Sequence, residues 1–124
     1  MASKITIPDL KKIRVTDPLF SHYADMVAKK MIPVQWEILN GKQGQSRCFC
    51  IDNFRIAGGT LQGEHRGVVF GDTDAYKWLE AVAYCANNGE TEYISQADEL
   101  IEIIGQAQQP DGYLNTYFTV CHPE

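Results

Sequence analysis

The sequence lacks any long apolar run, and its first residues lack the apolar core of a secretory signal. A membrane-spanning helix needs about 18 or more apolar residues in succession, and a signal peptide needs an apolar core of about 7 to 15. We therefore expect no membrane partner and predict a cytoplasmic location. The four cysteines, Cys48, Cys50, Cys85 and Cys121, are expected to stay reduced and to act as small, mostly buried apolar residues.

Basic residues are also scarce. The chain has 11 Lys and Arg against 16 Asp and Glu, which gives a net charge of −5. Its longest basic runs are the pairs Lys11-Lys12 and Lys29-Lys30. Binding to a nucleic-acid backbone requires a clustered basic face. The composition therefore excludes a nucleic-acid partner.

Motifs for metals and activated nucleophiles are missing as well. The histidines, at positions 22, 65 and 122, are too widely separated to form a metal-binding pair on one helix. Cys48 and Cys50 are one residue too close for a zinc or thioredoxin motif. The sequence contains no G-x-S-x-G elbow and no phosphate-binding loop. We therefore expect this chain to contain no catalytic residue, metal site or cofactor.

What the sequence does contain is helical periodicity. Asp17-Pro18 is a typical helix start, and Leu19, Phe20 and Tyr23 begin an apolar stripe after it. Pro33 is predicted to interrupt this helix, because its ring removes a hydrogen bond and clashes with the preceding turn. Further helices are predicted over 34–40, 48–57 and 92–108. Another is predicted to start at the capping or first-turn residues Asp72-Thr73-Asp74 and to end at Asn87-Asn88-Gly89.

These elements predict an all-α chain. A possible extended segment at Val68–Phe70 is the nearest approach to a strand, and residues 1–14 are predicted to form an extended arm. The short Asn87-Asn88-Gly89-Glu90 joint predicts that the helices on either side of it pack antiparallel as an αα-hairpin. Pro110-Asp111-Gly112 predicts a tight turn.

Three carboxylates stand at helix starts or turns, where each has two interpretations. Asp72 and Asp74 stand at the entry of the helix ahead of Ala75, and Asp111 lies in the turn. Each could cap or stabilise backbone, and each could contact a sugar hydroxyl through its second oxygen. Tyr113 follows the turn, where an aromatic ring could cover the apolar side of a sugar. Trp78 falls on an apolar stripe and is predicted to be core.

Two stretches resemble glycoside hydrolase family 127, which includes the β-L-arabinofuranosidases. They are Val-Phe-Gly-Asp-Thr-Asp-Ala-Tyr-Lys-Trp-Leu-Glu-Ala at 69–81 and Asp-Gly-Tyr-Leu-Asn-Thr-Tyr-Phe at 111–118. Ile-Pro-Val-Gln-Trp-Glu at 32–37 and Ile-Asp-Asn-Phe-Arg-Ile-Ala-Gly-Gly at 51–59 support them. The resemblance runs from about Val15 to the last residue and thus covers nearly the whole chain.

The resemblance implies a catalytic (α/α)6 barrel of antiparallel helix pairs. It also implies a cysteine nucleophile, a glutamate acid/base and a zinc ion held by cysteines and a glutamate. Those residues belong to motifs that lie further along the family's sequence, so we place none of them here. What the resemblance leaves for this chain is a contribution to substrate binding. The candidates are Gln43, Gln45, Asp72, Asp74, Asp111 and Tyr113.

We therefore interpret residues 1–124 as the N-terminal segment of the barrel domain of a hydrolase acting on L-arabinofuranosides or related glycans. The zinc would belong to the complete parent, and the segment alone is predicted to be inactive. The predicted helices are too few to close a barrel, and the open barrel should leave apolar surface exposed. Burial of that surface between copies of the chain should drive self-association. Two alternatives remain. One is a stand-alone helical oligomerisation or adaptor protein, and the other is part of a barrel hydrolase acting on unsaturated uronides.

Overall fold

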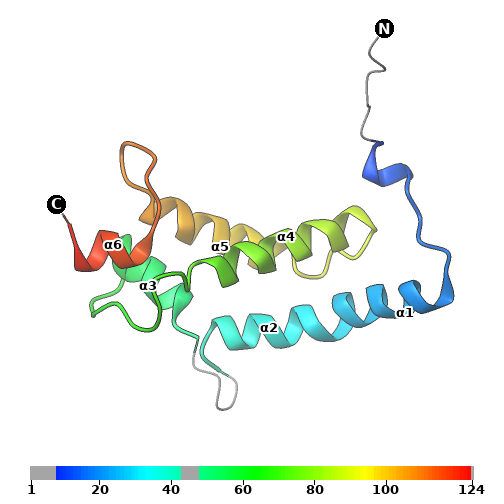
Figure 1. Cartoon of the computed structure of the whole chain (residues 1–124), viewed down its shortest axis with the longest axis horizontal. Helices are drawn as coiled ribbons and strands as arrows, with labels where there is room; N and C mark the ends of the chain where they lie inside the picture. Colours follow the sequence, from blue (N-terminus) through cyan, green and yellow to red (C-terminus); the bar gives the residue numbers. More distant parts are fainter. Residues whose placement is uncertain (1–7, 43–47, 124) are drawn as a thin grey trace, which may run out of the picture.

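The protein is described from a computed structural model that covers residues 8–42 and 48–123 (Figure 1). These residues are all-α, as predicted, and contain no strand. None of their helices is both long and apolar enough to cross a membrane. The elements in chain order are η1 Leu10–Lys12, α1 Pro18–Met26, η2 Val27–Met31, α2 Ile32–Leu39, α3 Cys50–Ala57, α4 Thr73–Asn87, α5 Ile94–Ala107 and α6 Thr116–Cys121.

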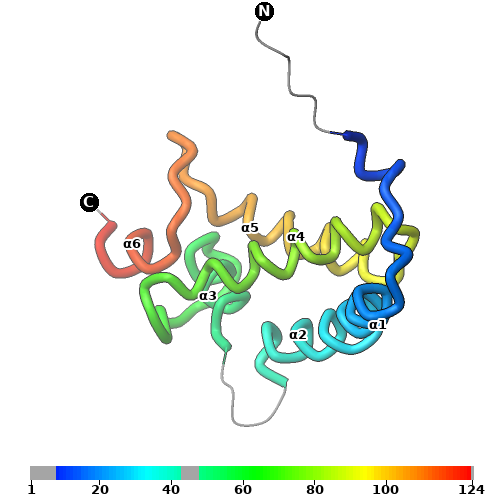
Figure 2. Tube along the Cα trace, turned by 45° about the vertical axis from the view of Figure 1, so that its right-hand side comes forward, coloured from blue at the N-terminus to red at the C-terminus, as the bar shows by residue number. Residues whose placement is uncertain are grey.

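The helices α4 and α5 form the antiparallel αα-hairpin that the sequence predicts (Figures 1 and 2). Gly89 closes their joint with a φ of 99°, in the left-handed region that glycine adopts without strain. The rod made by α1, η2 and α2 runs along α4, while α3 and α6 pack together at one end of the hairpin. The α3–α4 and α5–α6 connections meet at that same end (Figure 1).

The first helix begins where the sequence predicts, but Pro33 does not interrupt it. The Asp17 carboxylate accepts hydrogen bonds from the Leu19 and Phe20 amides, at 2.9 and 3.1 Å. Pro33 is the second residue of α2, and the turn before it, Val27–Met31, is a π-helix. The wider π turn closes with a bond from the Ile32 amide to the Val27 carbonyl. It allows the proline ring to fit without a break, so the predicted interruption is wrong.

The core lies where α2, α3, α4 and α5 meet. Phe54 of α3, Trp78 of α4 and Leu100 of α5 are buried, which confirms the prediction for Trp78. The Trp78 indole N–H donates to the Ile32 carbonyl at 3.0 Å, and its ring packs on Trp36 with centroids 4.7 Å apart. This bond ties α4 to the first turn of α2. The helix α1 contributes no buried residue.

Two short segments differ from the sequence predictions. Val68–Phe70 is not extended: the Gly71 amide donates to the Val68 carbonyl at 3.0 Å, which forms a turn leading into α4. Thr116–Cys121 forms a helix, α6, that the sequence analysis did not predict. Its cap is Asn115, whose side-chain oxygen accepts from the Phe118 amide at 3.1 Å. Six residues are too few for apolar periodicity to be recognised.

The predicted N-terminal arm is described only from Pro8 onward. There, η1 is a single 3-10 turn capped by the Asp9 carboxylate, which accepts from the Lys11 amide at 3.0 Å. Its residues are exposed. The boundary of the arm stays a prediction.

Candidate functional site

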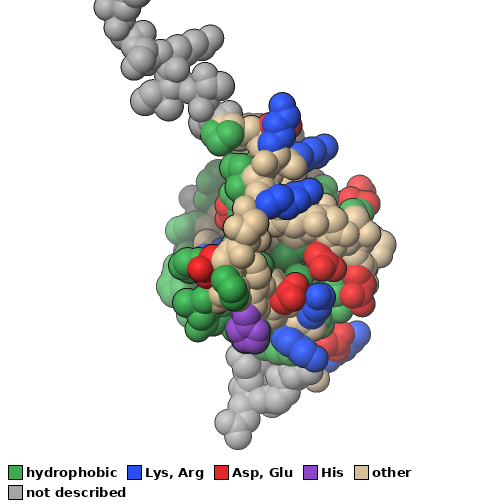
Figure 3. Space-filling view, turned by 90° about the vertical axis from the view of Figure 1, so that its right-hand side faces the viewer, with side chains coloured by type: hydrophobic (Ala, Val, Ile, Leu, Met, Phe, Trp, Pro, Cys, Tyr) green, Lys and Arg blue, Asp and Glu red, His purple; other side chains and the backbone are tan. Residues whose placement is uncertain are grey.

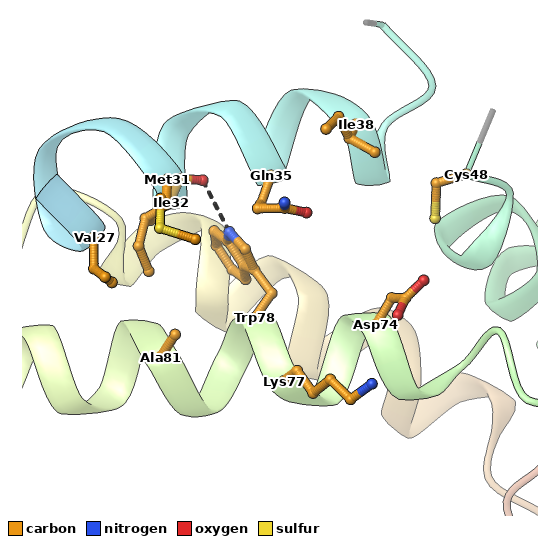
Figure 4. A pocket seen from close by; sticks show the side chains of 10 residues that line it. All are labelled: Val27, Met31, Ile32, Gln35, Ile38, Cys48, Asp74, Lys77, Trp78 and Ala81. Atoms are coloured by element: carbon orange, nitrogen blue, oxygen red, sulfur yellow. Dashed lines mark hydrogen bonds between the residues drawn. The ribbon is translucent and has the colours of Figure 1, made fainter. Parts of the chain in front are cut away.

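An open groove of about 470 Å³ runs between α2 and α4 (Figure 4). Gln35 of α2 and Asp74 and Lys77 of α4 supply its polar groups, and Trp78 forms part of its wall. Asp74 lies in the first turn of α4, where a carboxylate interacts favourably with the helix dipole. The groove thus combines an acid, a base, an amide and an aromatic ring, groups that could contact a polar ligand.

Cys48 lies at the α3 end of this groove, and Cys50 is the first residue of α3. The hydrogen bond with the Cys50 thiol lowers the pKa of Cys48 to about 6, and the Cys50 backbone N–H acts in the same direction. Burial and the Asp74 carboxylate oppose this shift. The hydrogen bond with Cys48 and burial both raise the pKa of Cys50. Cys48 is therefore the more acidic thiol of the pair.

Asp72 is buried and has a structural role different from the predicted one. It stands before α4, but its side chain makes no capping hydrogen bond to that helix. Instead it accepts from Thr116 of α6 twice, from the hydroxyl at 2.6 Å and from the amide at 2.8 Å. Asp72 is 4% exposed and Thr116 is 1% exposed. The expected cap of α4 is thus wrong, and the carboxylate stabilises the first turn of α6. A sugar contact by Asp72 stays a prediction.

Asp111 and Tyr113 line a second open hollow, of about 490 Å³, at the α5–α6 connection. The Asp111 carboxylate accepts from the Tyr113 amide at 2.9 Å, and Gly112 between them has a φ of 90°. This geometry confirms the turn prediction. Phe118 and His122 of the α6 region also line the hollow. An aromatic, an imidazole and a carboxylate are therefore close together here.

The structure does not gather the predicted site residues into one place. Asp74 lines the α2–α4 groove, Asp111 and Tyr113 line the second hollow, and Asp72 is buried against α6. Gln43 and Gln45 lie outside the described residues. Sequence reasoning missed the groove partners Gln35 and Lys77, because nothing local indicates that α2 packs on α4.

Asn53 of α3 was also missed. Its amide donates to the Arg66 carbonyl at 2.8 Å, and its oxygen accepts from the Arg66 backbone N–H at 3.0 Å. The amide nitrogen also lies 3.1 Å from His65 Nε2. Burial lowers the pKa of His65, which favours the neutral ring that can accept this bond. Asn53 is 2% exposed, and it fixes the α3–α4 connection to the core.

The described residues do not fit the zinc ion that the family resemblance implies for the parent. Within residues 8–42 and 48–123, no three side chains among His, Cys, Asp and Glu cluster closely enough to hold a metal. Structural zinc sites have four protein ligands, and catalytic sites usually have three.

Comparisons with known proteins show which family this chain resembles. A model of the catalytic domain of β-L-arabinofuranosidases of glycoside hydrolase family 127 matches residues 12–123. The non-reducing end β-L-arabinofuranosidase of Bifidobacterium longum subsp. longum is 33% identical over 122 residues, which cover 87% of this chain and 18% of the relative.

A solved crystal structure supports the same family. The structure of a family 127 β-L-arabinofuranosidase from Geobacillus stearothermophilus T6 superposes with a TM-score of 0.80 at 46% identity, covering 89% of this chain and 18% of that one. The chain thus spans about 18% of the length of each relative. Since the family model matches nearly all of its residues, this chain belongs to glycoside hydrolase family 127.

Proposed function

We propose that this chain forms part of the wall of a glycosidase domain that hydrolyses β-L-arabinofuranosides. The proposal is supported mainly by the 46% identity to the Geobacillus enzyme, because a likeness at that level extends over 89% of the chain. Both relatives are named for this activity. In this role α4 and α5 supply a helix pair of the barrel, and the turns at Asp72 and Asp111 supply residues at one end of it.

The chain alone is proposed to be inactive. The family resemblance implies a cysteine nucleophile and a glutamate acid/base, and both belong to motifs that lie further along the family's sequence than the segment matched here. Among the described acids, Asp74 and Asp111 line different hollows, and both oxygens of Asp72 accept from Thr116. Asp52 is paired with Arg66 at 2.7 Å. Asp52, Asp72 and Asp111 thus position backbone or side chains, which supports a scaffolding role.

A chimera tests the proposed function. Residues 12–123 would replace the matching segment of the Geobacillus enzyme, and release of L-arabinose from a β-L-arabinofuranoside would be measured. We expect the chimera to be active and the isolated chain to be inactive. A folded chimera with no arabinofuranosidase activity, or with activity on unsaturated uronides instead, would overturn the proposal. So would arabinose release by the isolated chain.

Self-association of the chain is part of the proposal, and the exposed apolar surface supports it. In α1, Leu19 is 59% exposed and Phe20 is 63% exposed, while Phe70 before α4 is 65% exposed. Hydrophobic side chains gather along one side of the α1 end of the molecule, and charged ones along the other (Figure 3). Burying such surface is worth about 25 cal/mol per Å². A second copy of the chain is therefore the proposed partner of α1.

Sedimentation analysis tests this. Phe20→Glu should shift the chain toward monomer, because it places a charge on the apolar face of α1. His22→Glu is the control, because it introduces a carboxylate at an exposed polar position of the same helix. A chain that sediments as a monomer at high concentration, or equal behaviour of both variants, would contradict the self-association.

A cytoplasmic location completes the proposal. All four cysteines are free in the structure, which suits a reducing compartment. Cell fractionation followed by immunodetection would measure the location directly, and recovery outside the cytoplasm would contradict it.

A further inference from the structure

The two thiols at the start of α3 form an unequal pair, which we call the Cys48–Cys50 pair. Cys48 is half-buried and lines the α2–α4 groove (Figure 4). Cys50 is 1% exposed and belongs to the core. Phe49 between them has a φ of −116° and a ψ of 8°, so the chain folds back here instead of extending. The two thiols are near enough for each to shift the pKa of the other. One thiol therefore lines the groove, and the other is buried in the core two residues further along the chain.

The surroundings of Cys48 favour its thiolate. The described residues supply no side-chain cap for α3, and the Cys50 backbone N–H in its first turn helps to lower the pKa of Cys48. A negative charge at this position interacts favourably with the helix dipole. The groups that act on the sulfur are the Cys50 thiol and backbone N–H from α3 and the Asp74 carboxylate from α4. Burial and Asp74 disfavour the charge, but the Cys50 groups outweigh them. Lys77 lies in the same groove.

We propose that the Cys48–Cys50 pair is a peroxide-reactive site, in which Cys48 is oxidised and Cys50 then closes a disulfide with it. The Cys48 thiolate attacks hydrogen peroxide, forms a sulfur–oxygen bond and breaks the oxygen–oxygen bond. One proton is taken up and one water is released. The Cys50 thiol then attacks the sulfenic acid, gives up its proton and releases a second water. Peroxide is reduced, and the two thiols are oxidised to one disulfide.

This site is independent of the proposed glycosidase role, and the other two thiols provide an internal comparison. Burial raises the pKa of Cys85, which disfavours its reactive thiolate. Cys121 is exposed, and no second cysteine is near it in sequence. Neither Cys85 nor Cys121 has a second cysteine nearby in the sequence that could convert a sulfenic acid into a disulfide. The pair should therefore react first and stop at the disulfide.

Mass spectrometry of tryptic peptides tests this directly. Cleavage after Arg47 and Arg55 releases one peptide, 48–55, that contains both members of the pair. Cleavage after Lys77 releases 78–124, which holds Cys85 and Cys121. After graded hydrogen peroxide and alkylation of the remaining thiols, we expect peptide 48–55 to lose two hydrogens at a dose that leaves peptide 78–124 fully alkylated. If the oxidised protein is reduced before alkylation, both cysteines of peptide 48–55 should again be alkylated.

Variants separate the two roles. In Cys50→Ser, Cys48 should stop at a sulfenic acid that dimedone labels. In Cys48→Ser, Cys50 should stay reduced at the same dose. Cys85→Ser is the matched control and should behave as the unmodified protein. Oxidation of both peptides at one dose, an unmodified peptide 48–55, or oxidation of Cys50 without Cys48 would each overturn the proposal.

Discussion

Replacing Thr116 with valine should destabilise the protein out of proportion to the size of the change. Valine keeps the shape of the side chain but removes the hydroxyl that donates to Asp72 at 2.6 Å. Asp72 and Thr116 are 4% and 1% exposed, so water cannot easily replace the lost donor. A hydrogen bond to a charged acceptor contributes about 1.5 to 3 kcal/mol. The free energy of unfolding should fall by about that amount, which is roughly a 10- to 100-fold rise in the unfolded population.

Thr119 provides a matched control on the same helix. Its hydroxyl is buried and has no hydrogen-bond partner among the described residues. Removing an unsatisfied hydroxyl leaves no acceptor behind, so Thr119→Val should be neutral or slightly stabilising. Thr116→Ser keeps the donor and should lose much less than Thr116→Val. The three substitutions thus separate the effect of the bond from that of a buried methyl group.

Urea unfolding followed by circular dichroism measures these differences, at several protein concentrations because association adds to apparent stability. Hydrogen exchange of the Thr116 amide, which donates to Asp72 at 2.8 Å, reports local opening of α6. If Thr116→Val costs no more than Thr119→Val in both measurements, the buried carboxylate does not depend on the hydroxyl, and our account of Asp72 is refuted.

Three further predictions concern packing and acidity. Gly58→Ala should lower the free energy of unfolding by about 1 to 3 kcal/mol in urea, because a Cβ there would lie 3.1 Å from the Gln106 backbone. At Gly105 an added Cβ would have no atom within 4 Å, so Gly105→Ala should instead raise the free energy of unfolding by about 0.5 to 1 kcal/mol. If both substitutions changed the free energy of unfolding in the same direction, the close approach at Gly58 would be refuted. Trp78→Phe should cost about 1 to 3 kcal/mol through the lost bond to the Ile32 carbonyl, and an unchanged urea midpoint would contradict this. Since the thiolate is the reactive form, the rate of Cys48 alkylation should rise with pH to half its maximum near pH 6, the pKa of Cys48. In the urea-unfolded chain the midpoint should move to about 8.5, and a folded midpoint already there would refute the shift.

Local patterns in the sequence predicted the long helices well. The periodic stripes fixed the existence of α4 and α5, and the short polar joint between them predicted their antiparallel packing. Pro33 shows where a local rule fails, because the π turn before it relieves the clash that the rule assumes. The helix α6 was missed since it is stabilised from a distance, through Asp72 of another element.

The candidate site was less predictable, because its residues come together through packing of separate helices. The turn at Asp111 could be read from neighbouring residues, and the structure confirms it. Nothing near Asp72 in the sequence indicates that its partner is Thr116, 44 positions away. Likewise, Cys48 and Cys50 were expected to act as mostly buried apolar residues, which suits Cys50 in the core and Cys48 half-buried against it. Only the position of the groove reveals that Cys48 is accessible.

The side chain of Asn53 restricts which genetic changes this position can tolerate. It donates to one backbone group of Arg66 and accepts from another, so its two ends perform opposite tasks at once. Aspartate offers only acceptors when ionised, and lysine offers only donors. No residue whose codon differs from an asparagine codon by one base presents a planar amide of this length. Every single-base mutation that replaces Asn53 should therefore lose at least one of its hydrogen bonds to Arg66 and destabilise the protein. When a library randomised at position 53 is selected for folded protein, asparagine should be recovered there.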